Sequence, residues 1–315
     1  MKKNTLSLIV MASVFVSILS INSCNSILEV SKIETNRAFN TRTNNKVQFS
    51  IIETGTAKTQ KAFAFKGGSL FENLKIAHIS VWVKHPNGDF LFDTGLGDSI
   101  NIQFDKGMSF FHKLMFKYKK GQSVKEQLLL NGLNNNSIRT IILSHLHWDH
   151  ASGINDFPNS DIYTTEEELK FAQSNKSFSP AFIKSQYNNK STKWKFLNFE
   201  KNKYEFFEES CDFFGDGSVI FVKLPGHTLG SIGMFINGQK RYFFTGDVTW
   251  AIEGFKRPSS KNRIPSKLVD YDKNKLDTTI IKIHTLMKLD TNLVVIPAHD
   301  FEIQKTLKHF PEFQY

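Results

Sequence analysis

Six consecutive residues near the middle of the chain, 145–150, read HLHWDH and place three imidazoles and one carboxylate side by side. The apolar run directly before them is typical of a buried strand, so the cluster begins where a strand ends. In extended backbone, side chains two residues apart project to the same side, so His145 and His147 can converge on one metal ion. Asp149 follows on that side, and His150 turns off where small residues predict a bend. A lone histidine is usually a core or surface residue, but this density of ligand-type residues favours a metal site.

Three more ligand-type residues follow predicted strands and lie in turns beside glycine or alanine. The predicted ligand sets are His145, His147 and His227 for one ion, Asp149, His150 and His299 for a second ion, and Asp247 as a bridge between them. Imidazole and carboxylate ligands suit two divalent ions, zinc first, with iron, manganese or cobalt as alternatives. The other histidines lie in no such context and are predicted to be ordinary core or surface residues: His78, His85, His112, His284 and His309.

Alternating and continuous apolar runs predict strands in both halves of the chain. The predicted strands cover residues 47–53, 62–65, 76–84, 90–93, 139–144, 161–163, 204–214, 219–224, 231–237, 239–244 and 293–296, and the predicted helices 123–133, 165–172 and 274–289. Ser123 and Thr165 are the predicted N-caps, with Gln127 completing a capping box for the first. In each half the strands come first, ligand-type residues occupy the loops after them, and helices follow. This order predicts two β-sheets packed face to face, helices on the outer faces, and a site in a groove along one edge.

Two other segments bear on the predicted site. Asp93, at a strand end before Thr94-Gly95, is a candidate carboxylate for holding a ligand histidine from behind. The stretch 101–120 is unusually apolar and is either a buried amphipathic helix or a flap over an apolar substrate chain. As a flap it would bring Phe110 and Phe111 into contact with substrate. The polar and aromatic stretch 174–203 is predicted to be an insertion beside the site.

The N-terminus has the pattern of an exported protein. Residues 1–23 place two lysines before an apolar run and predict a signal peptide. The residues before Cys24 resemble a bacterial lipoprotein signal, in which Cys24 becomes lipidated, while ordinary cleavage near Ser23 stays open. Residues 24–45 predict a flexible tether, and residues 46–315 one large domain. We therefore expect a periplasmic protein, a lipoprotein anchored to the outer membrane, or a secreted protein. Without Cys24, Cys211 has no partner for an intramolecular disulfide and is predicted to be a packing residue.

The formal net charge is +10, which by itself would allow a nucleic-acid or anionic-surface partner. The lysines are scattered among asparagines, however, and show no stacked-aromatic pattern, and part of the charge belongs to the predicted leader. The sequence therefore predicts a solvated basic surface and no nucleic-acid partner.

The ligand pattern resembles the metallo-β-lactamase superfamily. The resemblance rests on HLHWDH at 145–150, Gly226-His227, Gly246-Asp247 and the late His299, and it extends from about residue 46 to the C-terminus. It implies a four-layer αβ/βα sandwich of the α+β class and a dinuclear metal hydrolase site. The segment PAHDFEIQK at 297–305 further resembles the acyl-homoserine-lactone lactonases, which are quorum-quenching enzymes. The implied substrate is a small-molecule acyl lactone.

The predicted site supplies a mechanism for opening a lactone, a carboxylic ester. Two divalent ions bridged by Asp247 would make a metal-bridging hydroxide available near neutral pH for attack on the carbonyl. Asp149 or Asp247 would return a proton to the leaving alkoxide. The lactonases often carry a tyrosine three residues after the bridging aspartate, where it helps hold the substrate carbonyl. Here that position is Trp250, whose N–H can donate but cannot transfer a proton. Either that role is unnecessary, or another tyrosine supplies it, or the substrate differs.

Three other interpretations stay open. The same site could serve a thioesterase, a β-lactamase or a phosphodiesterase, although β-lactamase sites generally lack a bridging carboxylate such as Asp247. A redox member of the superfamily is disfavoured, because its di-iron relatives carry a glutamate where His147 stands. A non-catalytic metal-binding lipoprotein is disfavoured by the complete ligand set.

Overall fold

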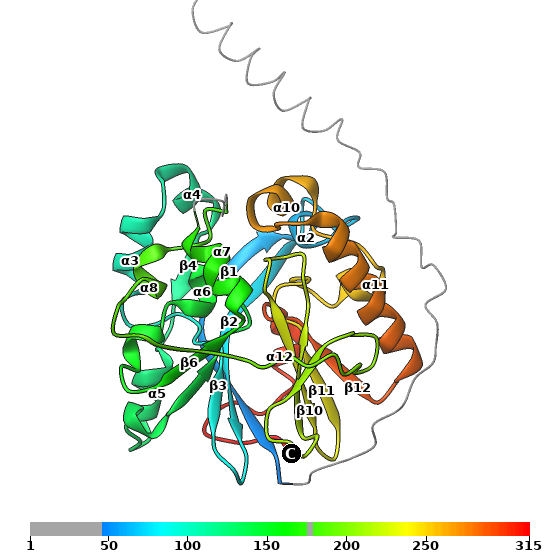
Figure 1. Ribbon diagram of the computed structural model, residues 1–315. Helices are drawn as coiled ribbons and strands as arrows, with labels where there is room; N and C mark the ends of the chain where they lie inside the picture. The colour runs from blue at the N-terminus through cyan, green and yellow to red at the C-terminus, as the bar shows by residue number, and fades with distance from the viewer. Residues whose placement is uncertain (1–45, 175–178) are drawn as a thin grey trace, which may run out of the picture.

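The computed structural model describes residues 46–174 and 179–315, which form two β-sheets flanked by helices (Figure 1). The larger sheet has the order β4-β1-β2-β3-β5-β6-β7. Its strands are β1 (Gln48–Gln60), β2 (Asn73–Lys84), β3 (Phe90–Phe92), β4 (Tyr118–Lys120), β5 (Thr140–Ile142), β6 (Asp161–Thr164) and β7 (Lys193–Phe196). The smaller sheet, in the order β12-β11-β10-β9-β8, contains β8 (Ser210–Asp212), β9 (Val219–Lys223), β10 (Ile232–Asn237), β11 (Arg241–Phe244) and β12 (Leu293–Ile296).

The two sheets face each other across an aromatic core. Phe49 of β1 lies edge-on to Phe244 of β11, with ring centroids 5.3 Å apart. Phe90 of β3 approaches Phe221 of β9 at 6.1 Å. All four side chains are nearly or fully buried, so the inner face of each sheet supplies the apolar surface that holds the sandwich together.

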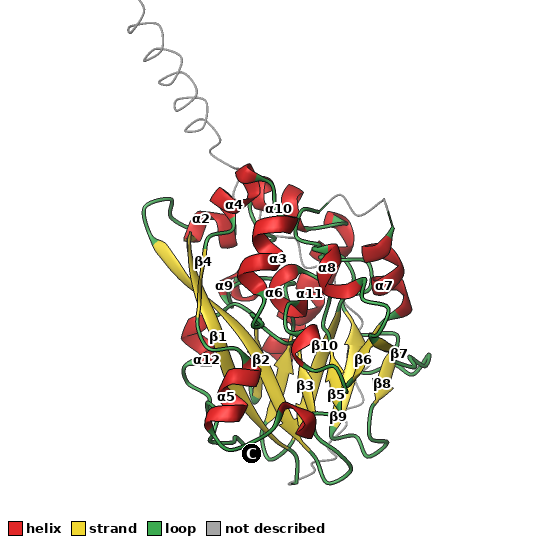
Figure 2. Ribbon diagram, turned by 90° about the vertical axis from the view of Figure 1, so that its left-hand side faces the viewer, coloured by secondary structure: helices red, strands yellow, loops and turns green. Residues whose placement is uncertain are grey.

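Helices cover the outer faces of both sheets. The helices are α2 (Lys61–Ala64), α3 (Ile100–Gly107), α4 (Phe110–Met115), α5 (Val124–Leu130), α6 (Trp148–Ala151), α7 (Glu166–Gln173), α8 (Lys184–Tyr187), α9 (Glu253–Lys256), α10 (Arg263–Val269), α11 (Lys273–Leu289) and α12 (Phe301–Gln304). The side chains of Leu276, Ile280 and Ile283 form one stripe of α11 and pack on the smaller sheet. Leu128 of α5 and Leu169 of α7 pack on the larger one. This arrangement confirms the predicted four-layer sandwich, and Figure 2 shows α2, α4 and α10 gathered at one end of it.

Some local predictions were wrong. Residues 62–65 lie mainly in the short helix α2, because the chain turns back after β1 through hydrogen bonds from Lys61 N to Glu72 O and from Ala62 N to Ser69 O. Within 204–214 only β8 is a strand, and Glu205 takes a positive φ of 52° in a tight turn before it. The capping box of α5 uses Glu126, which occupies the third helical position, and does not use Gln127.

The predicted signal peptide (1–23), tether (24–45) and lipidation site Cys24 lie outside the described residues, and they stay predictions. Among the residues that the structure describes, no helix is both long enough and apolar enough to span a membrane. Cys211 is partly buried against the inter-sheet core, and burial raises the pKa of its thiol to about 11. That position suits the packing role predicted for it.

Candidate metal centre

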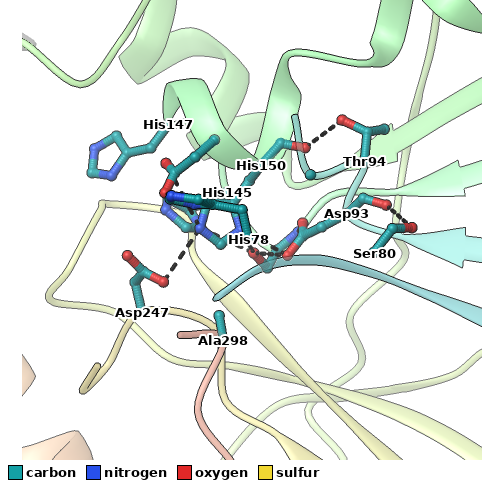
Figure 3. A network of polar contacts seen from close by, with 12 residues as sticks. His78, Ser80, Asp93, Thr94, His145, His147, His150, Asp247 and Ala298 are labelled. Atoms are coloured by element: carbon teal, nitrogen blue, oxygen red, sulfur yellow. Dashed lines mark hydrogen bonds and ion pairs between the residues drawn. The ribbon is translucent and has the colours of Figure 1, made fainter. Parts of the chain in front are cut away.

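Loops that follow strands of both sheets bring the predicted ligands to one edge of the sandwich. His145 follows β5, His227 follows β9, Asp247 follows β11 and His299 follows β12. Gly226 is required before His227 for two reasons. Its φ is +132°, and a Cβ at this position would lie 2.3 Å from the backbone nitrogen of Leu276 in α11. Figure 3 shows side chains of the loop after β5 facing Asp247, which comes from the other sheet.

The first cluster consists of three buried imidazoles. The Nε2 atom of His227 lies 3.2 Å from Nε2 of His145 and 2.9 Å from Nδ1 of His147. Burial and the neighbouring imidazoles lower the pKa values of His145 and His147 well below the ordinary value. Neutral rings present lone pairs, so three nitrogens converging at this spacing suit a divalent ion.

The second cluster combines carboxylates with imidazoles. His299 Nε2 lies 3.4 Å from Asp149 Oδ2 and 3.1 Å from Asp247 Oδ1. His150 Nε2 lies 3.3 Å from the same oxygen of Asp247. Burial raises the pKa of Asp247, but His299 and His150 outweigh it and hold that pKa well below the usual range. Asp247 is therefore a buried carboxylate anion surrounded by the imidazole rings of His150, His227 and His299.

Asp247 lies between the two clusters. Its Oδ1 faces His150 and His299, and its Oδ2 lies 3.6 Å from Nε2 of His227 in the first cluster. Two buried atoms at this point have no hydrogen-bond partner, namely Nε2 of His150 and Oδ1 of Asp247. Buried polar atoms are rarely left without partners. The donor set and these orphaned atoms fit two divalent ions, with Asp247 placed to bridge them.

A second layer of side chains and backbone atoms orients the ligands. Asp93 lies 2.9 Å from Nδ1 of His150, the kind of contact predicted for it, and also accepts hydrogen bonds from the backbone and hydroxyl of Ser144. Asp270 lies 2.8 Å from Nδ1 of His227. His299 Nδ1 lies 2.8 Å from the carbonyl oxygen of Ala77. Each such partner fixes which ring nitrogen faces the cluster.

Glu168 links the loop after β5, which carries His145 and His147, to the loop after β9, which carries His227. Its carboxylate is fully buried and accepts hydrogen bonds from the backbone N–H of Leu146, at 2.9 Å, and of Gly230, at 3.0 Å. Thr165, the predicted cap of α7, also donates to the carbonyl of Gly230. The sequence marks Glu168 only as an acidic residue in the first turn of a helix, so its bridging role was missed.

We expect Glu168→Gln to destabilise the protein by about 1–3 kcal/mol, because the amide offers one acceptor oxygen for two buried N–H groups. The measurement is the free energy of unfolding in denaturant, together with zinc affinity, which should also fall because both histidine loops lose their shared anchor. Glu167→Gln is the matched control, since Glu167 occupies the same turn with its side chain 54% exposed. Equal stability of the two variants would contradict this role.

A cavity of about 430 Å³ opens onto the second cluster. Its lining includes His147, Asp149, Asp247 and His299, together with Trp250. The indole Nε1 of Trp250 donates a hydrogen bond to Oδ2 of Asp247 at 3.2 Å, so the predicted donor does face the site. None of the described residues that line this cavity is a tyrosine, which removes support for a substitute tyrosine at this site.

The apolar stretch 101–120 was predicted to be either a buried helix or a flap over an apolar substrate chain, and different parts of it fit each prediction. Phe104 of α3 is buried in a core cluster, whereas no residue of α4 is buried. Phe110 and Phe111 are 79% and 62% exposed and are not among the residues lining the cavity. The lining is formed instead by the next turn, through Leu114 and Met115. The helix therefore borders the cavity, but with different side chains from those predicted.

The predicted insertion does lie beside the site. The ring of Phe182 packs edge-on against His147, with centroids 4.6 Å apart. Three further residues near the centre escaped the sequence interpretation. Asp270 and Lys261 form a buried pair behind His227, with Lys261 Nζ 2.9 Å from Asp270 Oδ1. The prediction that His78 is an ordinary histidine was wrong, because its Nδ1 lies 3.1 Å from Oδ2 of Asp149.

Known proteins that are similar to this chain in sequence include a lactonase and a probable metallo-hydrolase. N-acyl homoserine lactonase AttM of Rhizobium radiobacter is 24% identical over 202 residues, which cover 62% of this chain and 70% of that protein. A probable metallo-hydrolase of Mycobacterium tuberculosis is 24% identical over 238 residues, 69% of this chain and 73% of that protein.

Solved structures show the same architecture. An N-acyl homoserine lactone hydrolase, with N-hexanoyl-L-homoserine bound at its catalytic metal centre, superposes with a TM-score of 0.65 at 19% identity, covering 85% of this chain and 98% of that one. AidC, a dizinc quorum-quenching lactonase, superposes with a TM-score of 0.56 at 18% identity, covering 85% and 90%. The model of the metallo-beta-lactamase superfamily matches residues 77–299, most of the chain, and the chain therefore belongs to that superfamily.

Proposed function

We propose that this chain is a metal-dependent hydrolase that opens the lactone ring of N-acyl-homoserine lactones. The observation that carries the proposal is the cavity, which sets the candidate metal centre against an otherwise largely apolar lining. Its apolar lining comes from several elements: Ala57, Phe63, Ile76, Leu114, Met115, Phe116, Trp148, Ala181, Pro265, Leu268 and Val269. A ligand with a polar ring and an apolar tail matches this division, and the relatives named as lactonases act on such molecules.

The residues present suit ester hydrolysis. The two clusters would hold two divalent ions, which would supply Lewis-acid activation of the carbonyl and of a water molecule. Water adds to the carbonyl carbon, the ring C–O bond breaks, and the ring oxygen leaves with a proton to give the open hydroxy acid. Asp149 and Asp247 both line the cavity and are the candidates for carrying that proton. The Trp250 N–H can hold Asp247 or a substrate oxygen, but it moves no proton.

The deciding experiment measures ring opening of acyl-homoserine lactones by purified protein, before chelation, after chelation and after zinc is restored. We expect activity that is lost on chelation and recovered with the metal. A thioester, a β-lactam and a phosphodiester serve as competing substrates. Hydrolysis of one of these at a higher kcat/KM than any lactone would overturn the proposal and leave a different metallo-hydrolase.

The acyl chain should contribute to specificity through α4. Leu114 and Met115 line the cavity while remaining 51% and 40% exposed, so an apolar tail can cover them. Each methylene that becomes buried is worth about 0.8 kcal/mol, or about fourfold in kcat/KM when the gain is realised in the transition state. We expect long-chain lactones to be preferred over short ones and Met115→Ala to flatten that preference.

The control for this test is Phe110→Ala, because Phe110 lies on the same helix but outside the cavity lining. It should leave the chain-length profile close to that of the wild type. If Phe110 and Phe111 contact the substrate, as predicted from the sequence, then Phe110→Ala should flatten the chain-length profile instead. Comparing Met115→Ala with Phe110→Ala therefore separates these two interpretations of α4. Equal kcat/KM for short and long chains in the wild type would show that α4 forms no part of the substrate site.

A further inference from the structure

One buried imidazole beside the candidate ligands belongs to neither predicted set. His78 lies in β2, is 3% exposed and lines the cavity. Its Nδ1 is 3.1 Å from Oδ2 of Asp149, and its ring stands edge-on to that of His299 with centroids 5.3 Å apart. Neither ring nitrogen of His78 has a hydrogen-bond partner. Figure 3 shows His78 among the ligand-type side chains.

The backbone of β2 places His78 next to the candidate metal centre. The pairing of β1 with β2 is irregular between Glu53 and Gly55, and Gly55 is the residue opposite His78. Regular alternation along β2 puts Ala77 and Ile79 in the core between the sheets and His78 on the opposite face, where it lines the cavity. Ala77, the preceding residue, exchanges two contacts with His299, through its carbonyl oxygen at 2.8 Å and its backbone nitrogen at 3.3 Å. The strand that anchors His299 therefore also carries His78.

The distances around Asp149 fit a shared ion. Two ligand atoms that each lie about 2.0–2.2 Å from one ion are about 2.8–3.1 Å apart at a right angle and about 3.3–3.6 Å apart at the tetrahedral angle. Asp149 Oδ2 is 3.1 Å from His78 Nδ1 and 3.4 Å from His299 Nε2, and both distances fall in these ranges. The His78–Asp149 separation is also within hydrogen-bond range, but Nδ1 of His78 is among the buried atoms that have no hydrogen-bond partner.

We propose that His78 is an additional ligand of the second ion. The donors of that ion are then three imidazoles and two carboxylates: His78, His150, His299, Asp149 and Asp247. The first ion keeps its three imidazoles, so the two sites differ in donor number and charge. This assignment concerns the metal centre alone, and it stands whether or not a lactone is the substrate.

The test titrates metal-free full-length protein with Zn²⁺ in competition with a chromophoric chelator, for wild type, His78→Ala and His78→Asn. A lost orienting partner weakens a metal site by about 10–100-fold. We expect both variants to weaken the second ion by about 100-fold or more and to leave the first ion unchanged. Asparagine keeps a hydrogen-bond donor for Asp149 but replaces the imidazole, so it separates ligation from orientation.

A second readout is the visible spectrum of Co²⁺ at full loading, which should change in both variants because one nitrogen donor is lost. His284→Gln is the control: His284 is a buried histidine of α11 whose Nδ1 lies 2.7 Å from the carbonyl oxygen of Phe255, away from the centre. Circular dichroism of the metal-free proteins checks folding, and His78→Asn carries the test if His78→Ala does not fold. Wild-type zinc affinity and an unchanged cobalt spectrum in His78→Asn would overturn the assignment and leave His78 as a residue that orients Asp149.

Discussion

Asp247→Asn should abolish most of the hydrolytic activity and release at least one of the two metal ions. Asp247 faces both clusters, with Oδ1 3.1 Å from Nε2 of His299 and Oδ2 3.6 Å from Nε2 of His227. The amide removes the negative charge between two cations and turns one oxygen into an N–H group that repels them. Losing several kcal/mol of transition-state stabilisation corresponds to a fall in kcat/KM of about 10³-fold or more.

Metal content by elemental analysis and kcat/KM with the preferred substrate measure this effect. Asp105→Asn is the control, because Asp105 is an exposed residue of α3 that pairs only with Lys113 among the contacts described. It should retain both ions and full activity. An Asp247→Asn protein that keeps two ions at wild-type affinity and wild-type turnover would show that Asp247 is no bridge. If the Asp247→Asn protein retained only one metal ion and kept full activity, the two-metal interpretation would be wrong.

The elements that the sequence predicts well are those whose signal is local. Ile141 and Ile142, in the run before His145, are apolar and fully buried in strand β5, and the apolar stripe of α11 repeats with helical spacing. The candidate loop ligands could be predicted for the same reason, since a ligand-type residue that directly follows a strand and stands beside a glycine or alanine is visible without any knowledge of the fold.

The residues that were missed depend on contacts between distant parts of the chain. His78 sits inside the apolar run of β2, where a histidine is most often a core residue, yet its Nδ1 lies 3.1 Å from Oδ2 of Asp149, which follows a different strand. Glu168 reads as an ordinary first-turn acid, yet its side chain reaches loops 22 and 62 residues away. No spacing rule predicts such pairs, because they are fixed by which strands, loops and helices lie next to one another in the fold.

Phe110 and Phe111, the predicted substrate contacts, lie outside the cavity lining for a related reason. An apolar stretch predicts that some side chains are buried or cover a substrate. It does not predict which residues of a six-residue helix such as α4 do so. In α4, which Ser109 caps, Phe110 and Phe111 of the first turn are exposed, whereas Leu114 and Met115 of the last turn line the cavity. Helix orientation is a tertiary property, and the sequence pattern alone leaves it open.

The second large effect is expected from Asp270→Ala. Lys261 is fully buried, and its ammonium contacts Oδ1 of Asp270 at 2.9 Å and the carbonyl oxygen of Asp247 at 2.7 Å. Removing one partner of a buried ion pair leaves an uncompensated charge, which destabilises a protein by about 3–5 kcal/mol. The same substitution takes the hydrogen-bond partner from Nδ1 of His227, and zinc affinity at the first cluster should fall by about 10–100-fold.

Two further variants separate these effects. In Asp270→Ala/Lys261→Met both charges are gone, so the free energy of unfolding should return toward that of the wild type, while zinc affinity stays low because His227 still lacks its partner. Glu166→Ala breaks the exposed pair with Lys170 and should change stability by less than about 1 kcal/mol. If the double variant recovers wild-type zinc affinity together with its stability, then Asp270 serves only to neutralise Lys261, and the orientation of His227 is fixed by the turn around Gly226.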